Sequence, residues 1–194
     1  CPPTTDVEGY RSAILDENVL LKQTESTRKK SLRHLRELYG LAPAIPIFKA
    51  LRVLWGQSEQ IQPLLALFCA IARDPSLRAT ADLVASVPLG TLVTPQVLAK
   101  RVEENLTTNL KDSTLAKIGR NTASSWTQSG HLLGRTEKVR SKAQSHPMSV
   151  AYALFLGHLC GERGESLFHT FWAQLLDTPV HALREQAVLA SQQG

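Results

Sequence analysis

Apolar positions recur at helical spacing along almost the whole chain. The pattern is strongest in residues 45–73 and 150–176, where apolar side chains return every three or four positions. That period is typical of helices with one buried face. The sequence predicts helices at about 6–16, 26–39, 45–55, 59–73, 77–87, 95–106, 112–129, 148–160, 165–176 and 180–192.

Capping and breaking residues support most of these boundaries. Gly40 follows the second predicted helix, and Ser58 and Ser76 stand where capping hydroxyls are expected. The pairs Thr94-Pro95 and Thr178-Pro179 each place a capping residue before a proline, which favours a helix start.

The segment 110–142 carries the most informative polar pattern. On a helical wheel Leu115, Gly119 and Trp126 fall on one apolar arc together with Ile118, Thr122 and Ala123. The opposite arc has no acidic residue between positions 115 and 128, and it consists of Lys117, Arg120, Asn121, Ser124 and Gln128. Arg and Lys suit guanine edges, whereas Asn and Gln suit adenine edges. The segment predicts a recognition helix that enters a DNA groove, and the alternative is a helix with a basic solvent-exposed side.

The residues after this helix predict a basic hairpin. Gly130 stands at the position where a helix ends in the left-handed conformation. A short apolar pair, a glycine and a run of alternating basic residues follow, as expected for two short strands. With the helix at 95–106 and a polar turn at Thr107 to Asn109, the order is helix, turn, helix, wing. The alternative is a three-helix bundle with a mobile basic loop.

The predicted fold is all-α: a multi-helix protein with a winged helix-turn-helix-like unit and one small β-hairpin. We divide it into a helical region at 1–92 with a basic helix, the winged unit at 93–142, and a helical region at 143–194 that packs on the rest. The aromatic residues Trp55, Trp126 and Trp172 lie on apolar arcs and are expected in the core.

The net charge is +5, but the basic residues are concentrated in two islands. Residues 22–36 hold six basic residues against Glu25, and residues 111–142 hold seven against Asp112 and Glu137. Such clustering indicates a polyanionic partner. Neither island has the aromatic-rich apolar face of an interfacial helix, so no membrane is expected as the partner.

Each island supplies candidate phosphate contacts. In the first, Lys29, Arg33 and Arg36 form a stripe at i, i+4 and i+7, for which a solvated amphipathic helix is the equal alternative. In the second, the candidates are Arg135, Lys138 and Arg140 of the hairpin.

Several classes of function are disfavoured. The cysteines form no spaced motif, which indicates a reducing compartment, and neither a signal peptide nor a membrane-length apolar stretch is visible. A cytoplasmic location is therefore expected. No phosphate-binding glycine loop or nucleophile elbow occurs. His158, Cys160 and His169 match no zinc spacing, and Cys160 is expected in the core. We expect no enzyme activity, no cofactor and no metal.

Two stretches resemble a known family. Residues 17–30, ENVLLKQTESTRKK, continuing to Leu35-Arg36, resemble the N-terminal signature of the BrxA family of BREX (bacteriophage exclusion) phage-defence systems. Residues 113–118, STLAKI, and 129–133, SGHLL, resemble its later helix and glycine-leucine turn. The resemblance implies an all-helical fold similar to NusB-type RNA-binding factors and a DNA-binding, non-catalytic role. Other BREX components are the further partners that it implies.

Together these observations predict a DNA-binding accessory protein of a bacterial phage-defence system whose partner is double-stranded DNA. The alternatives are an RNA-binding NusB-like protein and a protein–protein adaptor in a defence complex.

Overall fold

The computed structural model describes residues 5–106 and 110–193. Within them the chain is mostly helical, as predicted, with one small antiparallel hairpin. The helices are α1 (Val7–Leu15), α2 (Glu25–Tyr39), α3 (Pro46–Trp55), α4 (Gln62–Arg73), α5 (Pro75–Ala79), α6 (Ala81–Ser86), α7 (Pro95–Asn105), α8 (Asp112–Gln128), α9 (Pro147–Leu159), α10 (Phe171–Gln174) and α11 (Val180–Gln192). Short 3-10 helices span Glu59–Ile61 and Gly164–His169, and the strands are β1 (Leu132–Leu133) and β2 (Val139–Arg140).

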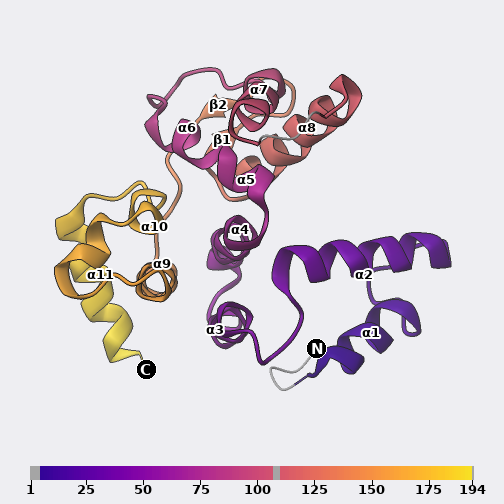
Figure 1. The fold of residues 1–194 in the computed structure, drawn as a ribbon. Coiled ribbons are helices and arrows are strands. Elements are labelled where there is room, and N and C mark those ends of the chain that lie inside the picture. Colours follow the sequence, from indigo (N-terminus) through magenta and orange to yellow (C-terminus); the bar gives the residue numbers. More distant parts are fainter. Residues whose placement is uncertain (1–4, 107–109, 194) are drawn as a thin grey trace.

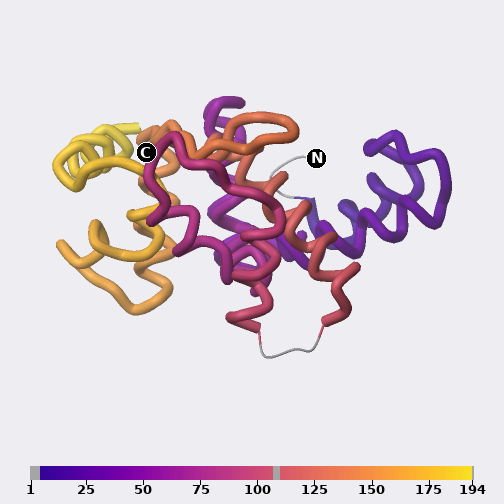
Figure 2. The backbone as a smooth tube through the Cα atoms, turned by 90° about the horizontal axis from the view of Figure 1, so that it is seen from above, coloured from indigo at the N-terminus to yellow at the C-terminus, as the bar shows by residue number. Residues whose placement is uncertain are grey.

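Helix α4 lies at the centre of the molecule. The α1–α2 pair stands on one side of it, α9–α11 stand on the other, and α5–α8 with the hairpin form a third group (Figures 1 and 2). Leu65, Phe68 and Ile71 of α4 are fully buried. Phe68 also contacts the rings of Tyr152 and Trp172 from the C-terminal helices. The apolar run that predicted the fourth helix therefore forms the central core.

Two predicted helices are interrupted. The segment 77–87 is broken at Thr80, whose hydroxyl donates to the carbonyl of Leu77 and separates α5 from α6. The segment 165–176 begins as a 3-10 helix and is broken at Thr170, which has an extended backbone and caps the single turn of α10. Local threonine hydrogen bonds replace the helical ladder at both breaks.

Some caps differ from those predicted. Thr94 caps α7 as expected, by accepting from the backbone N–H of Val97. Asp74, not Ser76, caps α5, and its carboxylate accepts from two backbone N–H groups. The prediction for Thr178 is wrong, since its hydroxyl donates backwards to Leu176 and α11 begins without a side-chain cap.

The hairpin is extended by a third stretch of backbone. Leu132 pairs with Arg140 and Leu133 with Val139, and Leu92 forms a further antiparallel bridge to Val139. The N–H of Arg140 also donates to the carbonyl of Thr91 at 2.8 Å. The chain before α7 thus runs beside β2, which lies between it and β1.

Other burial predictions have mixed outcomes. Trp126 and Trp172 are buried as expected, whereas Trp55 is half-buried. Cys160 was expected in the core but is exposed, because α9 ends at Leu159 and Cys160 follows the last buried turn. Among the described helices none is long and apolar enough to cross a membrane.

Candidate nucleic-acid interface

The inner face of α8 is fixed at several points along its length. A Cβ atom on Gly119 would lie 2.2 Å from the carbonyl oxygen of Pro95, so glycine is required where α8 crosses the start of α7. Further along, the indole N–H of Trp126 donates to the Thr80 hydroxyl at 2.9 Å. The same indole meets the His131 ring edge to face, with centroids 5.0 Å apart. These contacts determine which side of α8 faces outward.

The outward side carries the polar residues singled out in the sequence. Lys117, Arg120, Asn121, Ser124 and Gln128 are all exposed. Their side chains make no hydrogen bond or ion pair with any other residue that the structure describes. The two-faced pattern of this helix is therefore confirmed, and its polar groups are free to meet a ligand.

A cleft of about 810 Å³ runs along this side of α8. The α8 wall contributes four of the five polar candidates, and Arg120 instead lines a shallow hollow between α7 and α8. The opposite wall is the C-terminal half of α2, where His34, Glu37 and Tyr39 lie, and the floor comes from α4, including Ala66, Leu67 and Ala70. The end of α2, next to the first basic island, and the polar face of α8 therefore border one cleft.

A second hollow, rich in cations, adjoins the cleft on α2. Its lining consists of Lys29, Leu32, Arg33, Arg36, Glu37 and Arg73. Glu37 and Arg73 line both hollows and mark their junction. The guanidinium of Arg73 donates to the carbonyls of Glu37 and Arg36, at 3.0 and 3.3 Å, and so satisfies the end of α2.

The α2 cations differ in how they are paired. Lys29 contacts Glu25 at 2.6 Å and Arg33 contacts Glu37 at 3.8 Å, both across one helical turn at the surface. Arg36 makes no side-chain ion pair with a described residue. Exposed pairs of this kind contribute little to stability, so all three cations are available to a phosphate. No residue of α2 is fully buried, which leaves the stripe accessible along its length.

The hairpin presents only part of its predicted basic surface. Arg135 is exposed at the tip, next to Gly134, whose φ of 110° allows the tight turn. The ammonium of Lys138 is half-buried and donates to Thr127 of α8 at 2.9 Å and to the carbonyl of Gly134 at 3.2 Å. Lys138 therefore fastens the hairpin to the recognition helix candidate.

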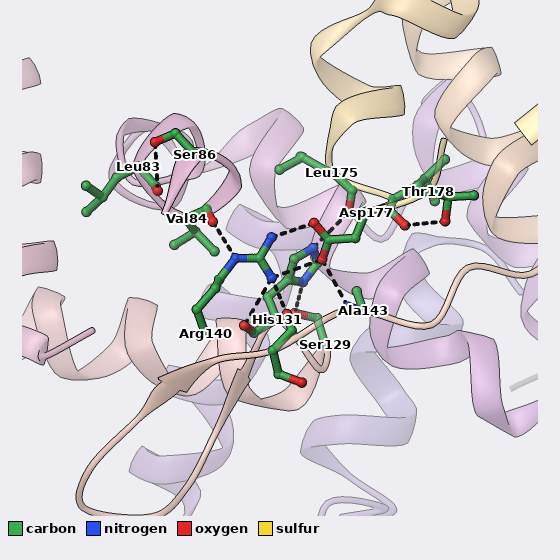
Figure 3. Close-up of polar contacts among 12 residues, drawn as sticks. Leu83, Val84, Ser86, Ser129, His131, Arg140, Ala143, Leu175, Asp177 and Thr178 are labelled. Atoms are coloured by element: carbon green, nitrogen blue, oxygen red, sulfur yellow. Dashed lines mark hydrogen bonds and ion pairs between the residues drawn. The ribbon is translucent and has the colours of Figure 1, made fainter. Parts of the chain in front are cut away.

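The expectation that Arg140 contacts phosphate is wrong. Its side chain is buried, and its guanidinium binds both carboxylate oxygens of Asp177. The Nε–H donates to the carbonyl of Val84 at 2.6 Å, and the remaining N–H groups are directed to backbone carbonyls (Figure 3). Alternation along the strand turns Arg140 inward, so this cation is structural.

His131 belongs to the same buried cluster (Figure 3). Its Nε2 lies 2.8 Å from the carbonyl of Leu175, which can only accept, so Nε2 carries the proton. Its Nδ1 lies 2.8 Å from the Ser129 hydroxyl and accepts from it. Burial lowers the pKa of His131 below its ordinary value of 6.5, and the nearby guanidinium of Arg140 lowers it further.

Sequence reasoning did not identify His34, Tyr39 and Arg73 as neighbours of α8. They precede the first residue of α8, Asp112, by 39 positions or more, and no short-range pattern indicates that α2 and α8 share a cleft. The position of the polar turn Thr107 to Asn109 lies outside the described residues.

In comparisons with protein-family models, with curated proteins and with solved structures, no match to this chain was found.

Proposed function

We propose that this chain is a non-catalytic DNA-binding protein that contacts duplex DNA through α8 and the hairpin. The observation that carries the proposal is the free polar face of α8 between two elements that hold it in place. On one side Gly119 lets α8 pack closely on α7, and on the other Lys138 ties the hairpin to α8. A helix whose orientation is fixed by such contacts can place its side chains accurately against base edges.

The order of the elements supports a winged helix-turn-helix unit. A helical segment (α5 and α6) is followed by the stretch at Leu92, then by α7, α8, β1 and β2. β2 pairs on one side with Leu92 and on the other with β1, so the hairpin is anchored to the chain that precedes the two helices. We infer that α8 is the recognition helix and that Arg135 stands at the tip of the wing.

The family assignment is also a proposal. The resemblance to the BrxA family rests on the residues named above, and it supports a cytoplasmic role in phage defence, with other defence components as further partners. Lys29 and Arg36 of the basic stripe on α2 and Lys117 of the α8 face lie in the segments that carry the resemblance.

A titration of fluorescent duplex DNA across a salt series tests the proposal. Roughly four to eight phosphate contacts give a log–log slope of about −4 to −7, because each releases a condensed counterion. Lys117→Ala removes an unpaired lysine from α8, and Lys49→Ala removes an exposed lysine from α3 as the matched control. We expect weaker binding only for Lys117→Ala. A slope shallower than about −2 contradicts duplex binding, and tight binding to an acidic protein surface in its place favours an adaptor.

A further inference from the structure

We infer that the cleft between α2, α4 and α8 receives an unpaired nucleotide of the bound nucleic acid. The inference deepens the proposed function and rests on it.

The polar face of α8 forms a cleft wall and not a ridge. A helix that lies in the major groove has DNA on both flanks. Here one flank of α8 faces α2 and α4, and Lys117, Asn121 and Gln128 line the cleft between them. Only Arg120, on the α7 side, lies outside it. A duplex that lies across the outer rim of α8 and the hairpin still meets the exposed polar side chains of α8, whereas whatever enters the cleft between α8 and α2 must be narrower than a duplex.

The lining of the cleft matches a nucleobase. Apolar side chains form much of the floor, including those of Leu67, Ala70 and Ile118. Two aromatic rings of α2, His34 and Tyr39, also line it, and such rings stack on splayed bases. The free amides of Asn121 and Gln128 each offer a donor and an acceptor to a base edge.

The charge beside the cleft matches the rest of the nucleotide. The adjoining hollow on α2 presents Lys29, Arg33, Arg36 and Arg73 against a single lining carboxylate, Glu37. Because Glu37 and Arg73 border both hollows, a strand whose base occupies the cleft has its phosphates over these cations. An apolar floor, free amides and cations lie side by side here, and together they match the base and the phosphate of a nucleotide. An acidic peptide would use the cations alone, so a nucleotide is the favoured ligand.

The test compares DNA duplexes that differ at one position. One is fully paired, and the other carries a single bulged 2-aminopurine, whose fluorescence depends on stacking. We expect the bulged duplex to bind roughly tenfold more tightly, because unpairing is least costly for a base that is already unpaired. We also expect its fluorescence to change when it enters the cleft.

A variant that fills the cleft separates the two modes of binding. Ala66→Trp places a large side chain on the floor, and Ala182→Trp makes the same change at a half-buried position of α11. Ala66→Trp should lose the preference for the bulged duplex while retaining paired DNA, and Ala182→Trp should behave as the parent chain. If circular dichroism shows that Ala66→Trp is unfolded, His34→Ala replaces it, because it removes an exposed ring of the cleft and no proposed duplex contact.

The outcomes distinguish the inference from the proposed function. Equal binding of both duplexes, or an unchanged preference in the filled variant, overturns the cleft assignment and leaves duplex binding intact. Failure to bind any nucleic acid overturns both. Displacement of the bulged duplex by a peptide but not by a short single strand identifies the cleft as a protein-docking site and also overturns the inference.

Discussion

The guanidinium of Arg140 donates to both carboxylate oxygens of Asp177, with Nη1 at 3.0 Å from Oδ2. This ion pair joins the hairpin to the C-terminal helices. Asp177 also accepts from the backbone N–H of Ala143 at 3.0 Å. The carboxylate thus binds the segment 140–143, which precedes it by more than thirty residues, at two points.

Replacing Asp177 by Ala is expected to destabilise the protein by about 3–5 kcal/mol, since a buried guanidinium loses its partner. Urea unfolding followed by circular dichroism measures the change. Glu165→Ala serves as the control, because Glu165 pairs with Arg184 at the exposed surface and should have little effect. An Asp177→Ala variant as stable as the parent would show that the pair does not hold the hairpin.

His131 predicts how stability depends on pH. The pKa of His131 is lowered in the folded chain, so below the ordinary pKa of histidine the unfolded chain binds a proton more readily than the folded chain does. The stabilisation is fully present above the unfolded value of about 6.5 and is lost as pH falls below it. We expect His131→Gln to flatten this acid-side decline in melting temperature. His181→Gln, at an exposed position on α11, should leave the decline as it is, and a parallel decline in both variants would contradict the assignment.

Gly119 predicts a steric effect at the crossing of α7 and α8. Gly119→Ala should cost about 1–3 kcal/mol, because the backbone carbonyl of Pro95 cannot move aside cheaply. Gly56→Ala is the matched control, since a Cβ at Gly56 meets nothing within 4 Å and its φ of −81° suits alanine. Thermal unfolding of both variants measures the difference in stability. Equal melting temperatures would mean that α7 and α8 can move apart at little cost in free energy.

The basic stripe on α2 predicts an electrostatic contribution to DNA affinity that is the same for every DNA sequence. Replacing Lys29, Arg33 and Arg36 with Ala should weaken binding on every DNA sequence and flatten the salt slope by up to about three units. By contrast, replacing Arg120 and Asn121 should cost about 1–3 kcal/mol per bidentate contact, mainly on a preferred sequence. Anisotropy titrations on two unrelated duplexes separate these patterns. The α8 assignment is wrong if the Arg120/Asn121 variant remains folded and binds every duplex as well as the parent.

The helical period predicted the two faces of α8 correctly because burial follows local spacing. Trp126 and Leu115 are buried, and Asn121 and Gln128 are exposed, as the wheel indicates. Local pattern also gave the glycine after this helix, where Gly130 has a φ of 83°. These features depend on neighbours within one or two turns of the chain.

Features that depend on distant partners were missed. Arg140 looked like one of several exposed hairpin cations, and only Asp177, far along the chain, reveals that it is buried. The cleft likewise arises from the packing of α2 and α8 against α4, which no periodicity encodes. The break at Thr80 in the helix predicted at 77–87 was missed because the Thr80 hydroxyl, besides donating to the local carbonyl of Leu77, accepts from the distant indole N–H of Trp126.

The pairing of Arg140 with Asp177 has a consequence for synthesis of the chain. A ribosome makes the cation well before the carboxylate that neutralises it. Until Asp177 has emerged, burying the guanidinium leaves an uncompensated charge, so the hairpin stays in water. Docking of the hairpin beside α8 is therefore coupled energetically to the C-terminal segment that carries Asp177.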